Sequence, residues 1–266
     1  LSQKHHFGSL EALTTPIPAL RLWASGDNAR LDPGFTMTTD WACLNFLHLD
    51  DHDPLEAYLD AVAREHDLTT SGQEPSVPSN HAQPIPTGWC SWYQFSTEDY
   101  KGRLTDQDIR ENLTSISEIS SHLPLQNVQI DDGFEAHVGD WFLFNNHFKQ
   151  GVAPLAAEIR EAGFTPGLWL APFIVDRRSQ LAANHPDWLI RGLFGRPANA
   201  GFLFGRLAAG LDLTHPDALA YIDDVIHTAI HEWDFSYLKL DFLFAAALAG
   251  QYHDPTRTRA QILRLG

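Results

Sequence analysis

The chain has 266 residues, of which 44% are hydrophobic and 11% aromatic, so it can bury a large core and does not resemble a disordered protein. Its formal net charge is -16, from 34 acidic and 18 basic side chains. This excess of negative charge argues against a nucleic acid or an anionic membrane as partner, because both would repel the chain. A neutral ligand is not excluded.

The cysteines exclude two further classes. Cys43 and Cys90 form no CxxC pair, and two cysteines cannot build a disulfide framework or a metal cage. We expect both to be small buried residues in a reducing compartment, which favours a cytoplasmic location. No apolar run is long enough to span a membrane. The chain starts at Leu1 rather than Met, so an upstream export segment would not be seen.

The first part of the chain predicts β-structure followed by a connection. Short apolar runs broken by turn residues predict strands in residues 1–50, at Leu20–Trp23, Thr36–Thr39 and Ala42–Phe46. Residues 54–66 have apolar side chains at helical spacing, and the Pro-rich stretch 69–86 reads as a linker. We therefore predict three parts: a β domain at 1–50, a connecting helix and linker at 51–86, and a further domain at 87–266.

After the linker, predicted strands alternate with predicted helices. Apolar runs predict strands at 88–93, 127–131, 165–173 and 237–244. Helical spacing predicts helices at 105–119, 152–162, 216–233 and 256–265. Their expected ends are marked by a capping box of Thr105 with Asp108, a stop at Gly163, and a cap at Thr214. In the first helix, Ile109, Leu113, Ile116 and Ile119 should be buried.

This alternation predicts βα units and therefore a parallel sheet. A doubly wound sheet and a (β/α)8 TIM barrel both fit the pattern. The barrel is favoured because no Gly-rich phosphate turn follows a strand and because polar residues gather at the carboxyl ends of the strands. A barrel needs about eight strands, and the pattern predicts about half of them. We therefore expect the first half of a barrel, preceded by the tail of an all-β domain.

The last predicted strand carries the first candidate for chemistry. The two-residue period of a strand places Tyr237, Lys239 and Asp241 on one face, near the mouth of the expected barrel. Lys239 would keep the Asp241 carboxylate ionised without a metal. An ionised carboxylate is what nucleophilic attack on an anomeric carbon requires. The alternative is a structural ion pair at the end of a strand.

The second candidate is the pair Asp131 and Asp132, which ends another apolar strand before Gly133. Glycine allows the sharp turn that this position needs. The two carboxylates could hold neighbouring hydroxyl groups of a sugar or bind a divalent cation. They could also cap backbone amides of the turn, as aspartates often do.

Aromatic residues form the third set. Trp92 and Tyr93 end the first predicted strand, Trp169 lies in the third, and Trp141 lies in a Gly-Asp-Trp segment. Flat rings beside hydrogen-bonding groups suit a pyranose, which has apolar faces and a rim of hydroxyl groups. The alternative for each tryptophan is packing in the core.

In combination, these motifs resemble the melibiase-type α-galactosidases of glycoside hydrolase family 36, over about residues 87–265. The resemblance rests on motifs that occur in the order of the family. They are GWCSWY at 88–93, QIDDGF at 129–134, GDW at 139–141, GLWLAPF at 167–173, HPDW at 185–188, LDLTHP at 211–216 and KLDFLFA at 239–245. It implies a catalytic (β/α)8 barrel, with residues 1–50 as the end of an N-terminal β-supersandwich.

The resemblance also implies roles for the candidates. Asp241 corresponds to the nucleophile at the end of barrel strand four, and Lys239 to a lysine that binds substrate hydroxyls. Asp131 and Asp132 correspond to the pair that holds O4 and O6 of galactose. The positions that correspond to the aromatic lining of the galactose pocket are Trp92, Tyr93 and Trp169, with Trp141 as a further wall.

The implied reaction is hydrolysis of terminal α-galactosides, such as melibiose or raffinose, by double displacement with retention. The implied acid/base lies on strand six, which we expect after Gly266. Neither a metal nor an organic cofactor is implied, and the expected partner is the oligosaccharide substrate. The resemblance also allows a homo-oligomer.

Three alternatives stay open at this point. The same machinery could cleave α-N-acetylgalactosaminides or transfer galactose, as the raffinose-synthase relatives do. A metal-dependent barrel enzyme could use Asp131, Asp132 and Asp241 as oxygen ligands, although Lys239 would repel the metal. The chain could also be a truncated sugar-binding fragment without activity.

Overall fold

The computed structural model describes residues 7–13, 19–25, 33–34, 36, 58–59, 61, 64, 86–95, 104–203 and 206–266. The chain divides into two compact units, Leu1–Pro84 and Ile85–Gly266. The three predicted domain ranges stay predictions.

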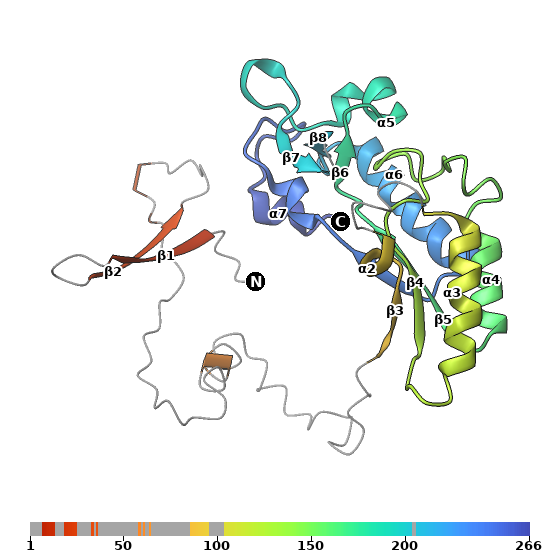
Figure 1. The fold of residues 1–266 in the computed structure, drawn as a ribbon. Coiled ribbons are helices and arrows are strands. Elements are labelled where there is room, and N and C mark those ends of the chain that lie inside the picture. The colour runs from red at the N-terminus through yellow and green to blue at the C-terminus, as the bar shows by residue number, and fades with distance from the viewer. Residues whose placement is uncertain are drawn as a thin grey trace. The chain divides into compact units, whose positions relative to one another are not determined.

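The first unit contains an antiparallel pair of strands, β1 (Phe7–Leu13) and β2 (Ala19–Ser25), drawn as the red arrows in Figure 1. The predicted strand Leu20–Trp23 lies within β2. The predicted strands at 36–39 and 42–46 and the linker at 69–86 lie almost wholly outside the described residues. Of the predicted helix at 54–66, the described residues Tyr58, Leu59, Ala61 and Arg64 are helical.

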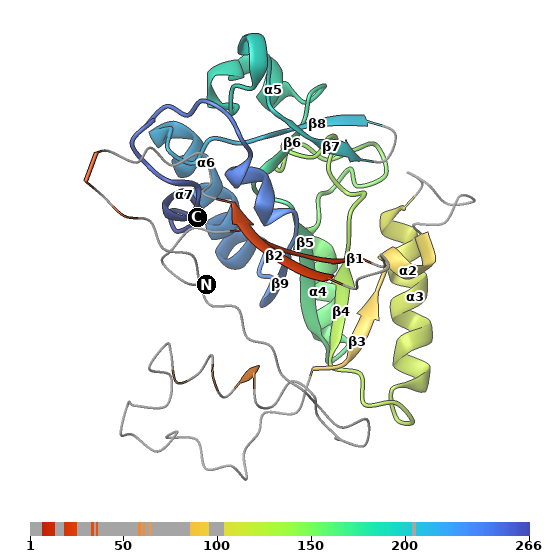
Figure 2. The same ribbon diagram turned by 90° about the vertical axis from the view of Figure 1, so that its left-hand side faces the viewer.

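The second unit is organised around a parallel sheet of four strands in the order β3-β4-β5-β9. These strands are β3 (Gly88–Cys90), β4 (Asn127–Ile130), β5 (Thr165–Leu170) and β9 (Tyr237–Leu240). All four predicted strands are therefore present, each shorter than predicted. Their order along the sheet follows their order in the chain, as Figure 2 shows. A doubly wound sheet would instead reverse direction at a switch point.

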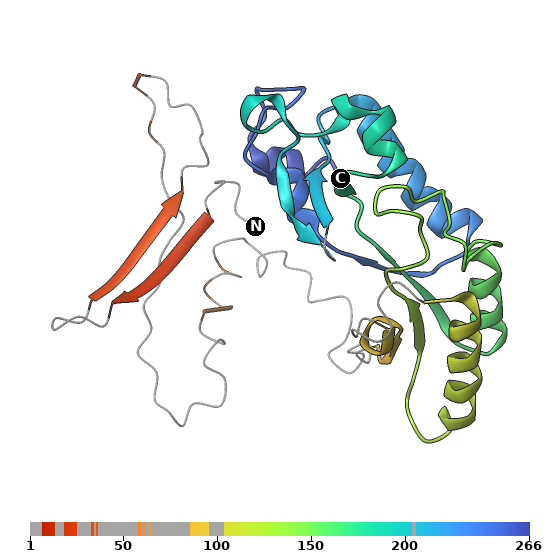
Figure 3. The ribbon, with the colours of Figure 1, turned by 45° about the horizontal axis from the view of Figure 1, so that its top comes forward.

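Three helices lie on one side of this sheet: α3 (Asp106–Ile119), α4 (Ala153–Glu161) and α6 (Pro216–His227), as Figure 3 shows. The predicted capping box of α3 is confirmed, because Thr105 accepts a hydrogen bond from the amide of Asp108 and the Asp108 carboxylate accepts one from the amide of Thr105. Gly163 follows α4 with φ of +90°, which confirms the predicted stop.

Two details of the helices were predicted wrongly. Ile119 is exposed, because it lies in the last turn of α3, beyond the part that packs on the sheet. Thr214 is not the cap of α6: His215 holds that position, and the Thr214 hydroxyl instead donates to Asp212 at 2.6 Å. The predicted helix at 216–233 continues beyond α6 as a π-helical turn at Thr228–Glu232.

A second sheet, which the sequence did not predict, lies between β5 and α6 in the chain. It is antiparallel, with the order β6-β8-β7, and consists of β6 (Ile174–Asp176), β7 (Asn199–Leu203) and β8 (Arg206–Gly210). The short helix α5 (Gln180–Asn184) and two 3-10 turns (Pro186–Trp188 and Leu193–Gly195) connect β6 to β7.

Strand ends were also overestimated. The predicted strand at 88–93 stops at Cys90, and Trp92 and Tyr93 belong to the short helix α2 (Trp92–Phe95). The strand predicted to reach residue 244 stops at Leu240 and is followed by a 3-10 helix, Leu243–Ala247. The last helix, α7, spans only Arg259–Leu263 and is capped by Thr258.

The two faces of the parallel sheet differ in chemistry. The residues that alternate toward the helices are fully buried and apolar, namely Val128, Ile130, Leu168 and Leu170. The other face carries Cys90 and Gln129 in paired register, and Gln129 is paired in turn with Gly167. A Cβ atom on Gly167 would lie 2.9 Å from the Tyr237 ring and 3.2 Å from the Gln129 Cβ. Glycine at this position therefore leaves room for the polar side chains of its neighbours.

Candidate active site

The candidate residues gather at one edge of the parallel sheet. Asp131 follows the last residue of β4, and Asp241 follows the last residue of β9. Trp169 and Lys239 are paired in register on β5 and β9. Because the strands are parallel, their carboxyl ends meet at the same edge, and the two-residue period turns these side chains to the face opposite the helices.

Asp131 is the most buried member of the group, with an exposed fraction of 2%. Its Oδ2 atom accepts hydrogen bonds from Gln129 Nε2 at 2.6 Å, Lys239 Nζ at 2.9 Å and Cys90 Sγ at 3.3 Å. Its Oδ1 atom accepts one from the Asp132 amide at 3.0 Å. A carboxylate offers about four acceptor sites, so one remaining site on Oδ1 could face a ligand.

Two of the donors to Asp131 have pKa values above their usual ones. Burial by itself would lower the pKa of Lys239, but the hydrogen bond and the charge of Asp131 outweigh burial and raise that pKa above its usual value. Lys239 therefore stays protonated, with one of its three N–H donors on Asp131. Burial also raises the pKa of the Cys90 thiol to about 11, so Cys90 donates as a neutral thiol.

Lys239 forms its direct ion pair with Asp131 rather than with Asp241. The sequence places Lys239 two residues before Asp241 on the same face, which suggests an ion pair between them. In the structure the ammonium group instead pairs with Asp131, although Asp241 still contributes to raising its pKa. The side chain of lysine is long enough to bridge from β9 past β5 to the end of β4.

Asp241 has a different environment. Its Oδ2 atom accepts a hydrogen bond from Trp169 Nε1 at 3.2 Å, and its Oδ1 atom accepts one from the amide of Phe242 at 2.8 Å. Its own amide donates to the carbonyl oxygen of Leu170 at 2.9 Å, which fixes the backbone to β5. The side chain is partly exposed. Asp241 is therefore oriented by two neutral donors and still accessible.

The backbone immediately after Asp241 is strained. Phe242 has φ of 52° and ψ of 30°, the left-handed region that bulky residues rarely adopt. Such a conformation costs about 1–3 kcal/mol and tends to occur at functional sites. Here it turns the amide of Phe242 onto the Asp241 carboxylate.

The predicted aromatic residues differ in their exposure. Trp169 and Trp141 are both buried, and their rings pack edge to face with centroids 5.9 Å apart. Trp141 therefore lies behind Trp169 rather than at an open wall, in agreement with the core-packing alternative. Trp92 is half-buried on α2, and Tyr93 on the same helix is 82% exposed. The assignment of these four residues to a galactose pocket stays a prediction.

Asp132 is half-buried and follows Asp131 at the start of a turn. Gly133 has φ of +125°, which confirms the predicted sharp turn. The described residues contain no group of three or more His, Cys, Asp or Glu side chains that could hold a metal ion. The metal alternative would use Asp131 as an oxygen ligand, and one oxygen of this residue, Oδ2, accepts a hydrogen bond from Lys239.

Sequence reasoning missed three members of the site. Gln129 and Cys90 donate to Asp131 Oδ2, and the Ser91 hydroxyl accepts a hydrogen bond from the amide of Asp131 at 2.9 Å. The signal for Gln129 was its position two residues before Asp131, on the same face of the strand. Cys90 and Ser91 could be found only from the register of β3 against β4.

Comparisons with known proteins agree on the class of protein. The Melibiase family model matches residues 105–262, which is more than half of the chain. The chain therefore belongs to the Melibiase family, a family whose members include α-galactosidases.

Three relatives illustrate this likeness. The α-galactosidase AgaA of Geobacillus stearothermophilus is 28% identical over 138 residues, which is 49% of this chain and 18% of AgaA. The α-galactosidase of Escherichia coli is 23% identical over 85% of this chain and 29% of its own length. A solved structure of the Thermus thermophilus α-galactosidase TtGalA, in complex with p-nitrophenyl α-D-galactopyranoside, is 38% identical with a TM-score of 0.57. This similarity covers 67% of this chain and 35% of TtGalA.

The chain thus spans about a fifth to a third of the length of these relatives. Within the residues that the structure describes, no helix is both long and apolar enough to cross a membrane.

Proposed function

We propose that the protein is a retaining glycoside hydrolase that removes terminal α-D-galactosyl residues from oligosaccharides of the melibiose or raffinose type. The observation that carries the proposal is the position of Asp241. It is a partly exposed carboxylate at the carboxyl end of β9, held by Trp169 and the amide of Phe242, beside the Asp131–Lys239 ion pair. An ionised and oriented carboxylate is the group that a retaining glycosidase uses as nucleophile.

We further propose that the parallel sheet is the first half of a (β/α)8 barrel. Three observations support this architecture: the strands follow one another in chain order, the helices lie on one side, and the polar residues meet at the carboxyl ends of the strands. Residues 1–50 would then form the end of an N-terminal β-sandwich domain.

In the first step, an oxygen of Asp241 forms a bond to the anomeric carbon while the bond to the departing glycosyl oxygen breaks. In the second step, water attacks the same carbon while its bond to the Asp241 oxygen breaks, which releases galactose, so two inversions give net retention. The hydrogen bond from Trp169 orients Asp241 for the first step. Both steps need an acid/base, and we assign no described residue to that role.

The Asp131 group would bind the galactose. Two N–H donors of Lys239 remain for substrate hydroxyls, and the free site on Asp131 Oδ1 can accept from another hydroxyl. The carboxylate of Asp132 lies next along the chain and would accept from a neighbouring hydroxyl. This set of one cation and two carboxylates discriminates between sugars through the positions of their hydroxyl groups.

The test is turnover of nitrophenyl α-galactoside by the complete protein, beside its N-acetylgalactosaminide counterpart. We expect release of nitrophenol from the α-galactoside and much less from the N-acetyl substrate, with no loss after EDTA treatment. Preference for the N-acetyl substrate would instead indicate an α-N-acetylgalactosaminidase. Transfer of galactose to sucrose in place of hydrolysis would indicate a galactosyltransferase. Loss of turnover on chelation would favour the metal-dependent alternative, and no turnover of either substrate would favour the inactive sugar-binding fragment.

A further inference from the structure

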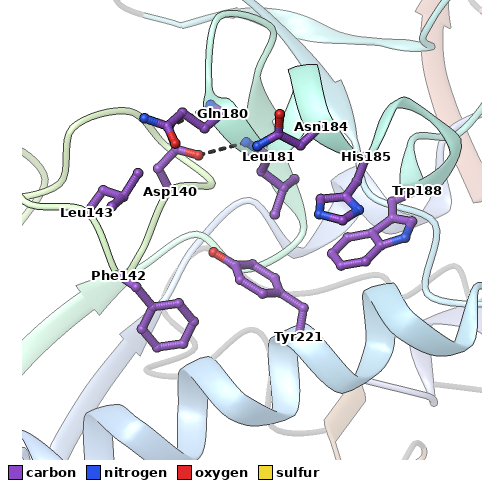
Figure 4. Close-up of a pocket in the computed structure, with 9 residues that line it drawn as sticks. All are labelled: Asp140, Phe142, Leu143, Gln180, Leu181, Asn184, His185, Trp188 and Tyr221. Atoms are coloured by element: carbon purple, nitrogen blue, oxygen red, sulfur yellow. Dashed lines mark hydrogen bonds between the residues drawn. The ribbon is translucent and has the colours of Figure 1, made fainter.

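A pocket is lined by residues outside the Asp131 and Asp241 group. It has a volume of about 190 Å³ and is shown in Figure 4. Its walls come from the loop between β4 and α4, from α5 with the turn that follows it, and from α6. The residues that line it are Asp140, Phe142, Leu143, Gln180, Leu181, Asn184, His185, Trp188 and Tyr221. None of the candidate catalytic or galactose-binding residues is among them.

The walls of this pocket are fixed by buried hydrogen bonds. The two carboxylate oxygens of Asp140 accept from the amides of Gln180 and Leu181, both at 2.9 Å, which joins the loop to the start of α5. The hydroxyl of Tyr221 donates to the carbonyl oxygen of Gly139 at 2.7 Å and accepts from the amide of Trp141 at 3.3 Å, which joins the same loop to α6. The pocket is therefore preformed, and a ligand would not have to order it.

Aromatic rings line one side of the pocket. Tyr221 lies between Phe142 and Trp188, as Figure 4 shows, with ring centroids 5.6 Å and 6.0 Å away. Trp188 is itself stacked on His185, with centroids 3.9 Å apart. This arrangement offers ring surfaces that can contact the apolar face of a small ligand.

The opposite side of the pocket is polar but offers little charge. Gln180 and Asn184 have exposed side chains whose amides can donate to hydroxyl groups and accept from them. No lysine or arginine lines the pocket, so an anion would find no counter-charge. Asp140 is buried, with both carboxylate oxygens bonded to backbone amides, so it is not placed to attract a cation.

From this chemistry we propose that the pocket is a second carbohydrate site, which takes one neutral sugar ring of an oligosaccharide. The apolar face of the ring would lie against Tyr221 and Trp188, and its hydroxyl rim would meet Gln180 and Asn184. Ligand pockets for larger molecules usually enclose about 300–1,000 Å³, so a pocket of about 190 Å³ fits a single ring rather than a long chain. The site would hold an oligosaccharide near the enzyme independently of catalysis.

The test uses the full-length protein with its galactose site already filled. The protein is first treated with 2-deoxy-2-fluoro-galactosyl fluoride, and mass spectrometry shows whether the covalent adduct has formed. Raffinose is then titrated, and its binding is followed by saturation-transfer NMR. We expect raffinose signals to persist in the trapped protein. Two lost amide contacts should weaken binding in Gln180→Ala/Asn184→Ala roughly tenfold.

A matched control is Asn146→Ala/Gln150→Ala, which removes two exposed amides outside the pocket and should leave binding unchanged. Trp188→Ala should remove the signal by deleting the platform, and its thermal unfolding shows whether it remains folded. The proposal is wrong if the trapped protein gives no raffinose signal, or if the signal survives in both pocket variants. Displacement of raffinose by tetramethylammonium would instead identify a site for cations. Failure to form the adduct would count against the galactosidase assignment, not against this pocket.

Discussion

Asp131 and Asp241 occupy equivalent places in the fold, each one residue beyond the end of a parallel strand, yet their surroundings are opposite. Asp131 is buried and receives four hydrogen bonds, one of them from the ammonium group of Lys239. Asp241 is partly exposed and receives two, both from neutral donors. One edge of a sheet can therefore carry two different carboxylates. The protein itself uses most acceptor sites of the first, whereas the second remains available for chemistry.

The largest effect on activity is expected from the removal of Asp241. Asp241→Ala should lower turnover by about 10⁴-fold or more, because the nucleophile is lost. The free energy of unfolding should change less than in Asp131→Ala, since only two hydrogen bonds from neutral donors to a partly exposed carboxylate disappear. The matched control is Asp223→Ala, which removes an exposed carboxylate on α6. Retention of activity in Asp241→Ala would refute the catalytic assignment.

Removal of Asp131 should instead lower the stability of the fold. Asp131→Ala leaves Gln129, Cys90 and the partly exposed Lys239 without their shared acceptor, so we expect a loss of about 2–4 kcal/mol in the free energy of unfolding. The value lies toward the low end for a broken ion pair because solvent reaches Lys239. Urea denaturation followed by near-UV circular dichroism measures it. Equal stability of the Asp131→Ala and Asp241→Ala proteins would remove the distinction between the two carboxylates.

The reactivity of Cys90 reports how well the residues around Asp131 are shielded from water. Burial raises its pKa from 9.0 to about 11, so at pH 8 the thiolate fraction should be about a hundredfold lower than for an ordinary cysteine. Because the folded-state pKa lies above the unfolded value, this residue also contributes stability that is lost as the pH rises from about 9 to about 11. The alkylation rate of the Cys90 peptide by iodoacetamide, measured by mass spectrometry, should therefore still be rising at pH 10.

The control is the same peptide in urea, where alkylation should level off one to two pH units earlier. A plateau near pH 9 in the folded protein would show that the Cys90 thiol, and with it the Asp131 cluster, is more open to water than the structure indicates.

A smaller effect on activity is expected when Asp241 loses one of its hydrogen bonds. Trp169→Phe keeps an aromatic ring but removes the N–H group that donates to Asp241 Oδ2. One lost hydrogen bond to a carboxylate should lower kcat roughly tenfold or somewhat more. A matched change is Trp233→Phe, which alters a partly buried tryptophan that packs on Phe144 outside the candidate site. It should leave kcat nearly unchanged, and an equal loss in both variants would mean that ring packing, not the hydrogen bond, explains the effect.

The sequence predicted the parallel strands and their main helices because local signals determine them. Apolar runs mark β4 and β5, and Thr105 with Asp108 marks the start of α3. The antiparallel sheet was missed because β6 has only three residues and β7 contains a glycine and a register shift, so neither shows a clear alternation. Local periodicity also could not show that the chain turns from β3 into α2 directly after Cys90.

Local sequence patterns also predicted only part of the candidate site. The two-residue period placed Lys239 and Asp241 on one face, but it could not show that Lys239 reaches Asp131, which lies 108 residues earlier in the chain. Likewise, the donors Gln129 and Cys90 become part of the site only through the pairing of β3 with β4. Strand positions follow from local sequence, whereas the partners of each charge follow from register, which is a property of the folded chain.

A trapping experiment shows directly whether Asp241 forms the covalent bond to the sugar. The complete protein would be incubated with a 2-deoxy-2-fluoro-galactoside that carries a good leaving group, then digested and analysed by mass spectrometry. We expect one added fluorogalactosyl group, located on Asp241 by fragmentation of its peptide. An adduct on Asp131 or Asp132, or turnover of the α-galactoside without any trapped adduct, would contradict this expectation.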